Sequence, residues 1–196
     1  MRLRFQVLFL CLLFLGLGGL AKAQAAVDAY LGFNTQMSAN DPSKLDLRGG
    51  LFPEFGGDLI FFHGLGFGGD VAWRGSQNQE FGVPYRPLYY DFNLVWEPLG
   101  SALNINPVLE AGIGAQSLRV YTNSYTCSSF SGCTNYISSN KFAEHLAAQL
   151  RFYITPHIFI APQAQFYFIH NNQDFGVGST RMLGIAIGYT LRSTPF

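Results

Sequence analysis

Apolar and polar residues alternate along most of this chain with a period of two. Between positions 183 and 192 every odd-numbered residue is large and apolar, and every even-numbered residue is small or polar. Positions 27–34 follow the same rule, with Asp28 and Asn34 on the polar face. A β-strand whose two faces meet different surroundings has this period. The pattern therefore predicts strands with one apolar and one small or polar face.

Eight segments of the chain show the alternation. Gly56-Gly57 and Pro53 interrupt the second one, and proline removes a donor from a strand ladder. The predicted strands are 27–34, 51–62, 65–74, 85–97, 103–120, 141–154, 158–170 and 183–192.

The connections between these segments alternate in length. Long, polar ones are predicted at 36–50, 76–84, 121–140 and 171–180, and short ones at 63–64, 98–102 and 155–157. Long loops at one end of an even-stranded meander and short turns at the other are typical of membrane barrels. The sequence thus predicts an all-β fold, an eight-stranded antiparallel up-and-down transmembrane β-barrel.

The N-terminus has a different character. Arg2 and Arg4 precede an apolar run that is followed by Ala21-Lys22-Ala23-Gln24-Ala25, which offers two A-x-A sites. This order is typical of a cleaved secretory signal peptide. We predict a signal peptide at 1–25 and a barrel domain at 26–196. A membrane anchor is the alternative, and the glycines between 16 and 19 argue against it.

Composition agrees with a chain that meets lipid. The 196 residues are 48% hydrophobic, 16% aromatic and only 12% charged, against about 25% charged in ordinary soluble domains. Formal net charge is zero, and cleavage would remove Arg2, Arg4 and Lys22 and leave a mildly acidic chain. No basic footprint suggests nucleic acid. After residue 25 no apolar run approaches the roughly 20 residues of a membrane helix.

The polar strand faces carry most of the charges together with many glycines. A narrow eight-stranded barrel has room inside for small residues and side chains that neutralise one another, whereas a water-facing surface needs neither. We therefore expect the apolar faces to contact lipid and the polar faces to form a buried network. Arg181 is a further candidate member of that network. The predicted network is Asp28, Glu54, Asp58, Asp70, Arg74, Asp91, Glu110, His145, Gln149 and Arg151.

Aromatic residues are expected to form girdles at the membrane interfaces. A soluble lipocalin-like barrel or a β-sandwich would instead use the apolar residues as an inner core, and both stay open as alternatives. The girdle candidates are Trp73, Tyr85, Tyr89, Tyr90, Trp96, Phe152 and Tyr189.

Two cysteines remain after the predicted cleavage, because Cys11 leaves with the signal peptide. Cys127 and Cys133 lie in the longest predicted loop, and an exported chain meets an oxidising compartment. We expect them to form a disulfide. A metal site is the alternative, but a lone C-x5-C pair is a poor zinc pattern. The loop is either a contact surface for a ligand or a segment that the disulfide protects from fraying.

No motif specifies an enzyme, a cofactor or a metal. Residues 64–69 match G-x-G-x-x-G, but no helix follows, so the dinucleotide fingerprint does not apply. His63 and His157 lie in predicted turns, and His170 ends a strand. Loop serines could supply a nucleophile, but nothing orients them. They are Ser128, Ser129 and Ser131.

The chain resembles the small OmpA-type outer-membrane β-barrels, and the group of uncharacterised exported proteins described as outer membrane protein β-barrel domains. The stretches that carry the resemblance are Pro53-Glu54-Phe55-Gly56-Gly57, Pro84-Tyr85-Arg86-Pro87 with Tyr90-Asp91-Phe92, Ala111-Gly112-Ile113-Gly114-Ala115 and Gly184-Ile185-Ala186-Ile187-Gly188-Tyr189.

This resemblance implies a bacterial outer-membrane protein that contacts lipid and lipopolysaccharide, with a structural or surface-interaction role and a plugged lumen. A small-solute pore, a lipid-modifying enzyme and a soluble carrier are the alternatives. Such barrels end in an aromatic residue, which is part of a signal that the barrel-assembly machinery recognises. Here Phe196 has no apolar residue at alternate positions before it, and the signal is predicted to end at Leu191.

Overall fold

The computed structural model describes residues 25–37, 49–75, 78–80, 83–99, 104–128, 132–170 and 179–192. Among them, no helix has the length and apolar character needed to cross a membrane. The strands are β1 (Ala26–Gln36), β2 (Gly49–Phe62), β3 (Leu65–Trp73), β4 (Asn78–Glu80), β5 (Val83–Trp96), β6 (Ile105–Ser128), β7 (Gly132–Tyr153), β8 (Ile158–Ile169) and β9 (Ser179–Arg192).

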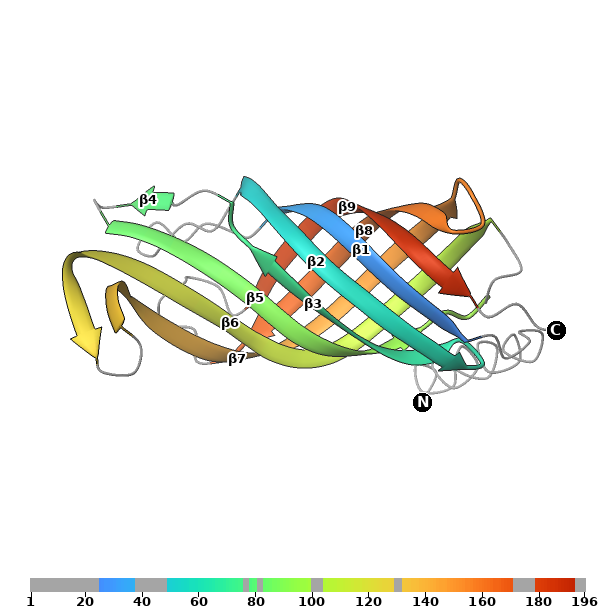
Figure 1. The fold of residues 1–196 in the computed structure, drawn as a ribbon, viewed down its shortest axis with the longest axis horizontal. Coiled ribbons are helices and arrows are strands. Elements are labelled where there is room, and N and C mark those ends of the chain that lie inside the picture. The colour runs from blue at the N-terminus through green and yellow to red at the C-terminus, as the bar shows by residue number, and fades with distance from the viewer. Residues whose placement is uncertain are drawn as a thin grey trace, which may run out of the picture.

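Eight of these strands form a closed antiparallel barrel (Figure 1). The hydrogen-bonded order is β3-β2-β1-β9-β8-β7-β6-β5-β4, and a pairing between β3 and β5 closes the ring. Neighbouring barrel strands follow one another in the chain, apart from β1 and β9, the first and last strands, and the passage from β3 to β5 around the short β4. The predicted eight-stranded up-and-down barrel is confirmed, and β4 is a small addition that pairs only with β5.

The two ends of the barrel differ as the loop lengths predict. At one end, here called the turn end, β2 and β3 are joined by His63 and Gly64, whose φ angles of 49° and 78° suit the two central residues of a tight hairpin turn. β7 and β8 are joined at the same end by residues 154–157, and β1 starts and β9 ends there. The opposite end is called the loop end below.

Burial alternates along the barrel strands, most regularly in β1, β3 and β8. In β1 buried and exposed residues alternate strictly, and Val27, Leu31 and Phe33 are on the exposed face. Large apolar side chains are exposed all around the barrel, including Leu31, Phe92, Ile113 and Ile185, each at least half accessible. Because these side chains point away from the interior, they do not contribute to a protein core. Together they form a belt of outward apolar side chains around the barrel.

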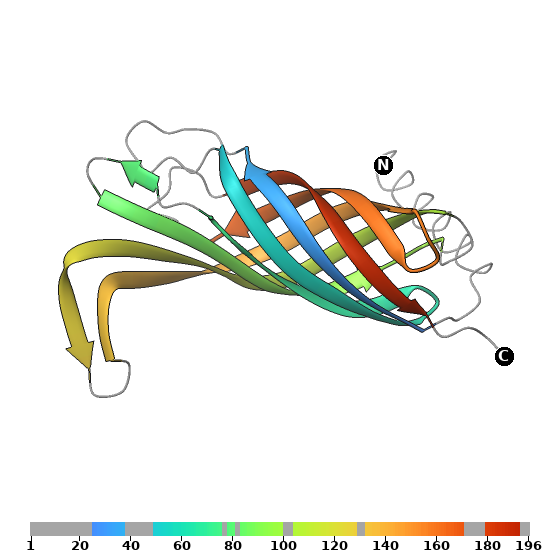
Figure 2. The same ribbon diagram turned by 45° about the horizontal axis from the view of Figure 1, so that its top comes forward.

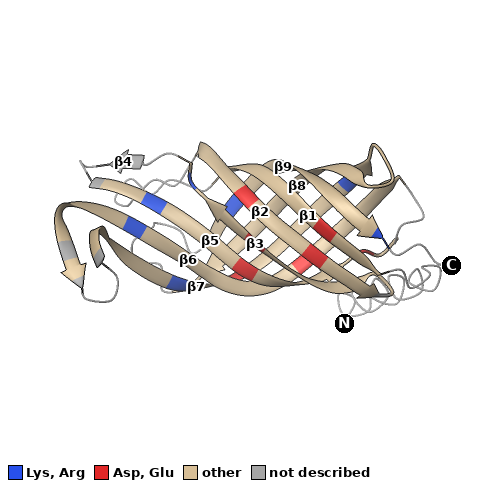
Figure 3. Cartoon of the chain, viewed as in Figure 1, with Lys and Arg blue, Asp and Glu red and all other residues tan. Residues whose placement is uncertain are grey.

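Charged residues follow a different distribution (Figure 3). The acidic residues of β1, β2, β3, β5 and β6 point inward and are buried, and basic residues mark β5, β6 and β7 toward the loop end. Glu144 of β7 is an acidic residue that points outward. Its carboxylate lies 3.3 Å from Nε2 of His170, which is about equally exposed. Arg181, a candidate for the interior, is instead exposed on the outer face of β9.

The longest predicted loop is largely a β-hairpin, which corrects the sequence prediction for 121–140. β6 and β7 continue to Ser128 and Gly132, and they leave the barrel as a curved arm (Figure 2). The register of the β6–β7 pairing shifts between Tyr121 and Thr126, which marks an irregularity within the hairpin. Both faces of the arm meet solvent, so it lacks the alternation that revealed the other strands, and its polar residues appeared to be a loop.

Two of the girdle candidates lie inside the barrel. Tyr85 and Tyr89 are fully buried and lie on the inward face of β5. Their position in the period-two register decides this, because residues 85, 87 and 89 share the face of Asn93. The girdle assignment was wrong for these two tyrosines, which belong to the packing of the interior.

Candidate functional site

The structure places all ten residues of the predicted polar network inside the barrel. Nine of them retain at most 6% of their accessible surface, and the side chain of Asp91 retains 1%. Alternation along each strand produces this arrangement, since inward positions recur at every second residue. The interior divides into layers, which differ in how their charges are balanced.

The layer nearer the turn end is built around Arg151 of β7. Asp28 of β1 and Asp58 of β2 are directly opposed in the β1–β2 pairing. The Arg151 guanidinium lies between them, donating from Nη1 to Oδ2 of Asp28 and from Nη2 to Oδ2 of Asp58, each at 2.5 Å. It also lies over the ring of Phe159, with Cζ 4.8 Å from the centroid. A fixed cation therefore offsets the repulsion between two facing carboxylates.

A second ion pair lies where the lumen reaches the turn end. Nη2 of Arg192 is 3.7 Å from Oε1 of Glu97, which also accepts a hydrogen bond from Asn106. Arg192 lies over the ring of Tyr153, 4.4 Å from its centroid. Burial raises the pKa of Glu97, while Arg151 and Arg192 act in the opposite direction.

The middle layer holds Asp70, Asp91 and Glu110 around Asn93 and His145. Asp70 of β3 and Asp91 of β5 are directly opposed in the strand pairing that closes the barrel. The Asn93 amide nitrogen lies 2.9 Å from Asp70 Oδ2, 2.6 Å from Asp91 Oδ1 and 3.4 Å from Glu110 Oε2. His145 Nδ1 lies 2.9 Å from the Asn93 amide oxygen and 3.2 Å from Asp91 Oδ1. No arginine takes part in these contacts of the described side chains.

Glu54 is held by neutral amides. Gln163 and Gln165 donate to its two carboxylate oxygens at 2.6 and 2.9 Å, and Asn34 donates to the same oxygen as Gln163. Gln149 donates similarly to Glu110 at 2.8 Å. Sequence reasoning placed these amides on inward faces but did not include Asn34, Asn93, Gln163 and Gln165 in the network. Their inward register was the signal that could have found them.

Arg74 lies toward the loop end, apart from the Arg151 layer. Its guanidinium carbon is 5.7 Å from the centroid of the Phe52 ring. Aromatic residues fill the space between: Tyr89 packs against Tyr167 with ring centroids 4.8 Å apart, and Tyr167 stacks on His145 at 4.5 Å. The interior is thus packed with large side chains from both the polar and the aromatic groups.

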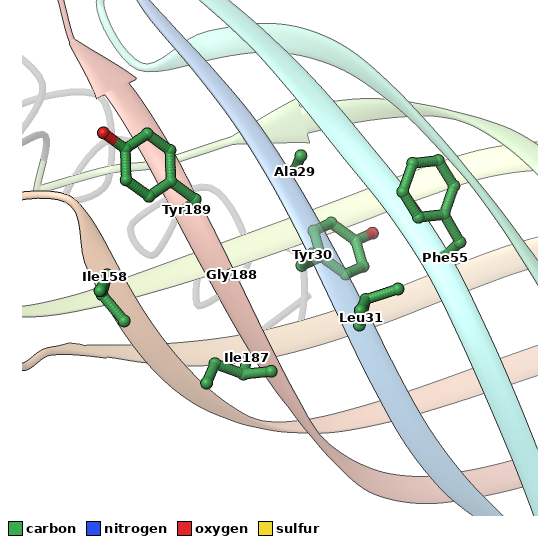
Figure 4. Close-up of a pocket in the computed structure, with 8 residues that line it drawn as sticks. All are labelled: Ala29, Tyr30, Leu31, Phe55, Ile158, Ile187, Gly188 and Tyr189. Atoms are coloured by element: carbon green, nitrogen blue, oxygen red, sulfur yellow. The ribbon is translucent and has the colours of Figure 1, made fainter.

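Two hollows on the outer face of the barrel are lined entirely by described residues. An apolar one of about 340 Å³ lies over β1, β2, β8 and β9, with the side chains of Leu31, Phe55 and Ile187 around it (Figure 4). A smaller one of about 250 Å³ lies at the loop end, and Trp73, Arg86, Leu88 and Arg119 are among the residues that line it. The apolar lining of the first hollow suits an acyl chain. The second hollow is lined by two guanidinium groups, those of Arg86 and Arg119.

Among the described residues, the histidines and serines form no catalytic arrangement. His63 and His157 lie in the turns that precede β3 and β8, and Nδ1 of His157 lies 3.0 Å from the Thr190 carbonyl oxygen. The serines considered as nucleophiles cannot be placed: Ser129, Ser131 and the side chain of Ser128 lie outside the described residues.

Comparisons with known proteins place the fold. No family model and no curated protein matches the sequence. Among solved structures, the chain is similar to Neisserial surface protein A, with a TM-score of 0.61 and 10% identity, covering 86% of this chain and 99% of that chain. A major outer membrane protein from Thermus thermophilus gives a TM-score of 0.58 and 11% identity, covering 85% and 99%.

A third structure is that of Ail, the attachment invasion locus protein of Yersinia pestis, in complex with the heparin analogue sucrose octasulfate. Its TM-score is 0.54 and its identity 15%, covering 87% of this chain and 99% of that chain. The fold is that of the small eight-stranded outer-membrane β-barrels. At these identities the likeness concerns the fold alone, and the role of this barrel has to be argued from its own residues.

Proposed function

We propose that this chain is a bacterial outer-membrane β-barrel protein with a structural or surface-interaction role. The belt of outward apolar side chains is the observation that carries the proposal. Ile185 of β9 and Phe92 of β5 lie on well-separated strands and expose 52% and 63% of their surface. Soluble proteins rarely expose continuous apolar surface of this extent, whereas a lipid-facing band requires it. The turn end then faces the periplasm and the loop end faces outward.

The lumen is proposed to be plugged. Arg151, Tyr30 and Tyr167 are among the large side chains that are almost fully buried in the interior. An eight-stranded barrel has an interior just wide enough for its own side chains. This supports a structural barrel over the alternative, a small-solute pore, which needs a continuous water path past these residues.

The arm formed by β6 and β7 supports a surface-interaction role. It extends beyond the barrel at the loop end (Figure 2), and it exposes Tyr125 and Ile137 at 72% and 67%. Cys127 and Cys133 face each other in register near its tip and form a disulfide. Exposed aromatic and aliphatic groups on a braced hairpin fit a partner with an apolar contact patch.

Membrane fractionation tests the proposal directly. The processed protein should sediment with outer membranes, require detergent to stay in solution, and migrate differently on gels with and without boiling. A monodisperse protein in buffer without detergent would overturn it.

Planar-bilayer recordings distinguish a plugged barrel from a small-solute pore. The plugged barrel should give no steady conductance, and a reproducible channel would favour the pore.

Export and assembly complete the proposal. The signal peptide predicted at 1–25 falls on residues outside the described part of the chain, apart from Ala25, and so does Phe196. Export would deliver the chain to the barrel-assembly machinery, and β9 carries the alternating apolar residues up to Leu191 that such a signal requires. No enzymatic activity and no nucleic-acid partner form part of this proposal.

Lipopolysaccharide is the proposed lipid partner, at the hollow near the loop end. Arg86 and Arg119 are directly opposed in the β5–β6 pairing, on the outer face. Two like charges in this position destabilise a strand pair, and among the described side chains no ion pair with a carboxylate joins either guanidinium. A lipid phosphate would offset both charges, and Trp73 and Leu88 would contact its apolar neighbours.

The double variant Arg86→Gln/Arg119→Gln is therefore expected to bind diphosphoryl lipid A about tenfold or more weakly, since each arginine near a membrane surface contributes about 1 kcal/mol. Titration of the detergent-folded protein, followed by tryptophan fluorescence, measures this because Trp73 lines the hollow. Arg181→Gln, an exposed arginine of β9, is the matched control. Equal loss in both variants would point to general charge attraction and contradict the site.

The disulfide is expected to stabilise the tip of the arm and not the barrel. Replacing Cys127 and Cys133 by serine should ease local opening of the tip by about 2 kcal/mol, the entropy of closing a short loop. Limited proteolysis should then cut the arm faster in the variant, while the gel shift on boiling stays the same. A variant whose barrel no longer folds would show that the disulfide has a wider role.

A further inference from the structure

Two layers of the lumen each contain a pair of facing aspartates, but the negative charges of the two pairs are compensated differently. Asp28 faces Asp58 across one strand pairing, and Asp70 faces Asp91 across another. The first pair holds the Arg151 guanidinium between its carboxylates. No arginine takes part in the hydrogen bonds and ion pairs that the second pair makes with the described side chains, and Glu110 adds a third carboxylate beside it. Buried charges require compensation, so the second layer is short of positive charge.

The hydrogen bonds of the middle layer do not make up for this shortage. The amide nitrogen of Asn93 lies within hydrogen-bond distance of oxygens from Asp70, Asp91 and Glu110. An amide NH2 group has two hydrogens, so it cannot satisfy three carboxylates at once. Gln149 donates to Glu110 and the Tyr167 hydroxyl donates to Asp91, but neither brings a charge.

Two buried atoms of this layer lack any hydrogen-bond partner among the described residues. One is Oδ1 of Asp70 and the other is Nε2 of His145. Both side chains are more than nine-tenths buried. His145 Nδ1 is next to two acceptors, the Asn93 amide oxygen and Asp91 Oδ1, so it carries a proton and donates. In the neutral ring this leaves a bare lone pair on Nε2, and Asp70 contributes a bare carboxylate oxygen.

We propose that Asp70, Glu110 and His145 form a binding site for a divalent metal ion inside the barrel. One potential ligand atom from each residue lies within 4.8 Å of the others. Two carboxylates and one imidazole form a mixed oxygen and nitrogen set, which suits Zn²⁺ or Mn²⁺ better than Ca²⁺ or Mg²⁺. Asp91 and Asn93 orient the imidazole through Nδ1, as outer partners of metal-bound histidines do.

The ion would take the place in this layer that Arg151 has in the other. It would offset the facing carboxylates of Asp70 and Asp91 and tie together β3, β6 and β7. The closing pair of the barrel, β3 with β5, carries two of these groups. Because a preformed site is absent from the unfolded chain, metal binding would add to the stability of the folded barrel.

Metal analysis of untagged protein tests the site. The chain is folded in detergent with excess Zn²⁺, passed through a desalting column and measured for zinc per chain. We expect about one retained equivalent for the unaltered protein, and its thermal unfolding should shift upward with added Zn²⁺. Asp70→Asn and His145→Gln should each bind Zn²⁺ at least tenfold more weakly and lose most of that shift.

The matched control is His170→Gln. This residue forms the exposed pair with Glu144, which is the place where zinc would bind adventitiously on the outside. The control should retain the full equivalent. The proposed site would be overturned if the unaltered protein folds but retains no zinc and shows no thermal shift. It would also be overturned if His170→Gln were the only variant to lose zinc. That first outcome would mean that protons balance the layer, and it would leave the membrane barrel itself intact, because the gel shift on boiling reports folding separately.

Discussion

Replacing Arg151 by methionine is expected to lower the free energy of unfolding of the barrel by about 3–5 kcal/mol, the usual cost of breaking a buried ion pair by removing one partner. The reason is the pair of aspartates that Arg151 separates. Without the guanidinium, Asp28 and Asp58 face each other across β1 and β2 with no cation between them. Urea titration of the protein folded in detergent or lipid vesicles measures the change.

A rescue variant distinguishes lost charge balance from lost packing. Arg151 also covers the ring of Phe159, so methionine keeps part of that contact. Adding Asp28→Asn and Asp58→Asn to Arg151→Met removes the two charges and should restore a large part of the stability. Arg86→Met, which removes an arginine from the outer face, should change stability by less than about 1 kcal/mol. A triple variant as unstable as Arg151→Met would show that packing, not charge, is what Arg151 supplies.

The alternation of residue types was sufficient to predict the barrel. A strand that separates two environments must repeat every second residue, so the lipid-facing set could be read from positions such as Ile185 and Leu31 without any knowledge of pairing. The same rule placed Asp28, Asp70 and Glu110 inside. Loop lengths then ordered the strands, since antiparallel neighbours need only short turns.

Pairing inside the lumen could not be predicted in the same way. Which carboxylates meet Arg151 depends on the register between strands far apart in the chain, such as β1 and β7, and the sequence does not reveal that register. Neutral amides are also hard to weigh: Asn93 looks like any inward polar residue, and its contacts with three carboxylates appear only in the folded barrel. The arm of β6 and β7 escaped prediction because neither of its faces is lipid-exposed.

The apolar belt makes a second strong prediction. Ile185 lies near the middle of β9, next to Phe33 of β1 and Pro162 of β8 in the strand pairing, and it points outward. Replacing it by arginine should cost about 2–4 kcal/mol, the cost of a charged side chain at the midplane of a bilayer. The change is measured by urea titration in lipid vesicles.

Ile137→Arg is the matched control for this variant. Ile137 is even more exposed than Ile185, at 67% against 52%, but it lies on the arm beyond the barrel. If the belt faces lipid, arginine is costly at 185 and nearly neutral at 137, although both side chains are accessible in the isolated structure. A soluble barrel would tolerate both substitutions, because arginine on an exposed strand face in water costs little. Equal, small effects at the two positions would therefore contradict the membrane assignment, and a large difference follows only if hydrocarbon surrounds β9.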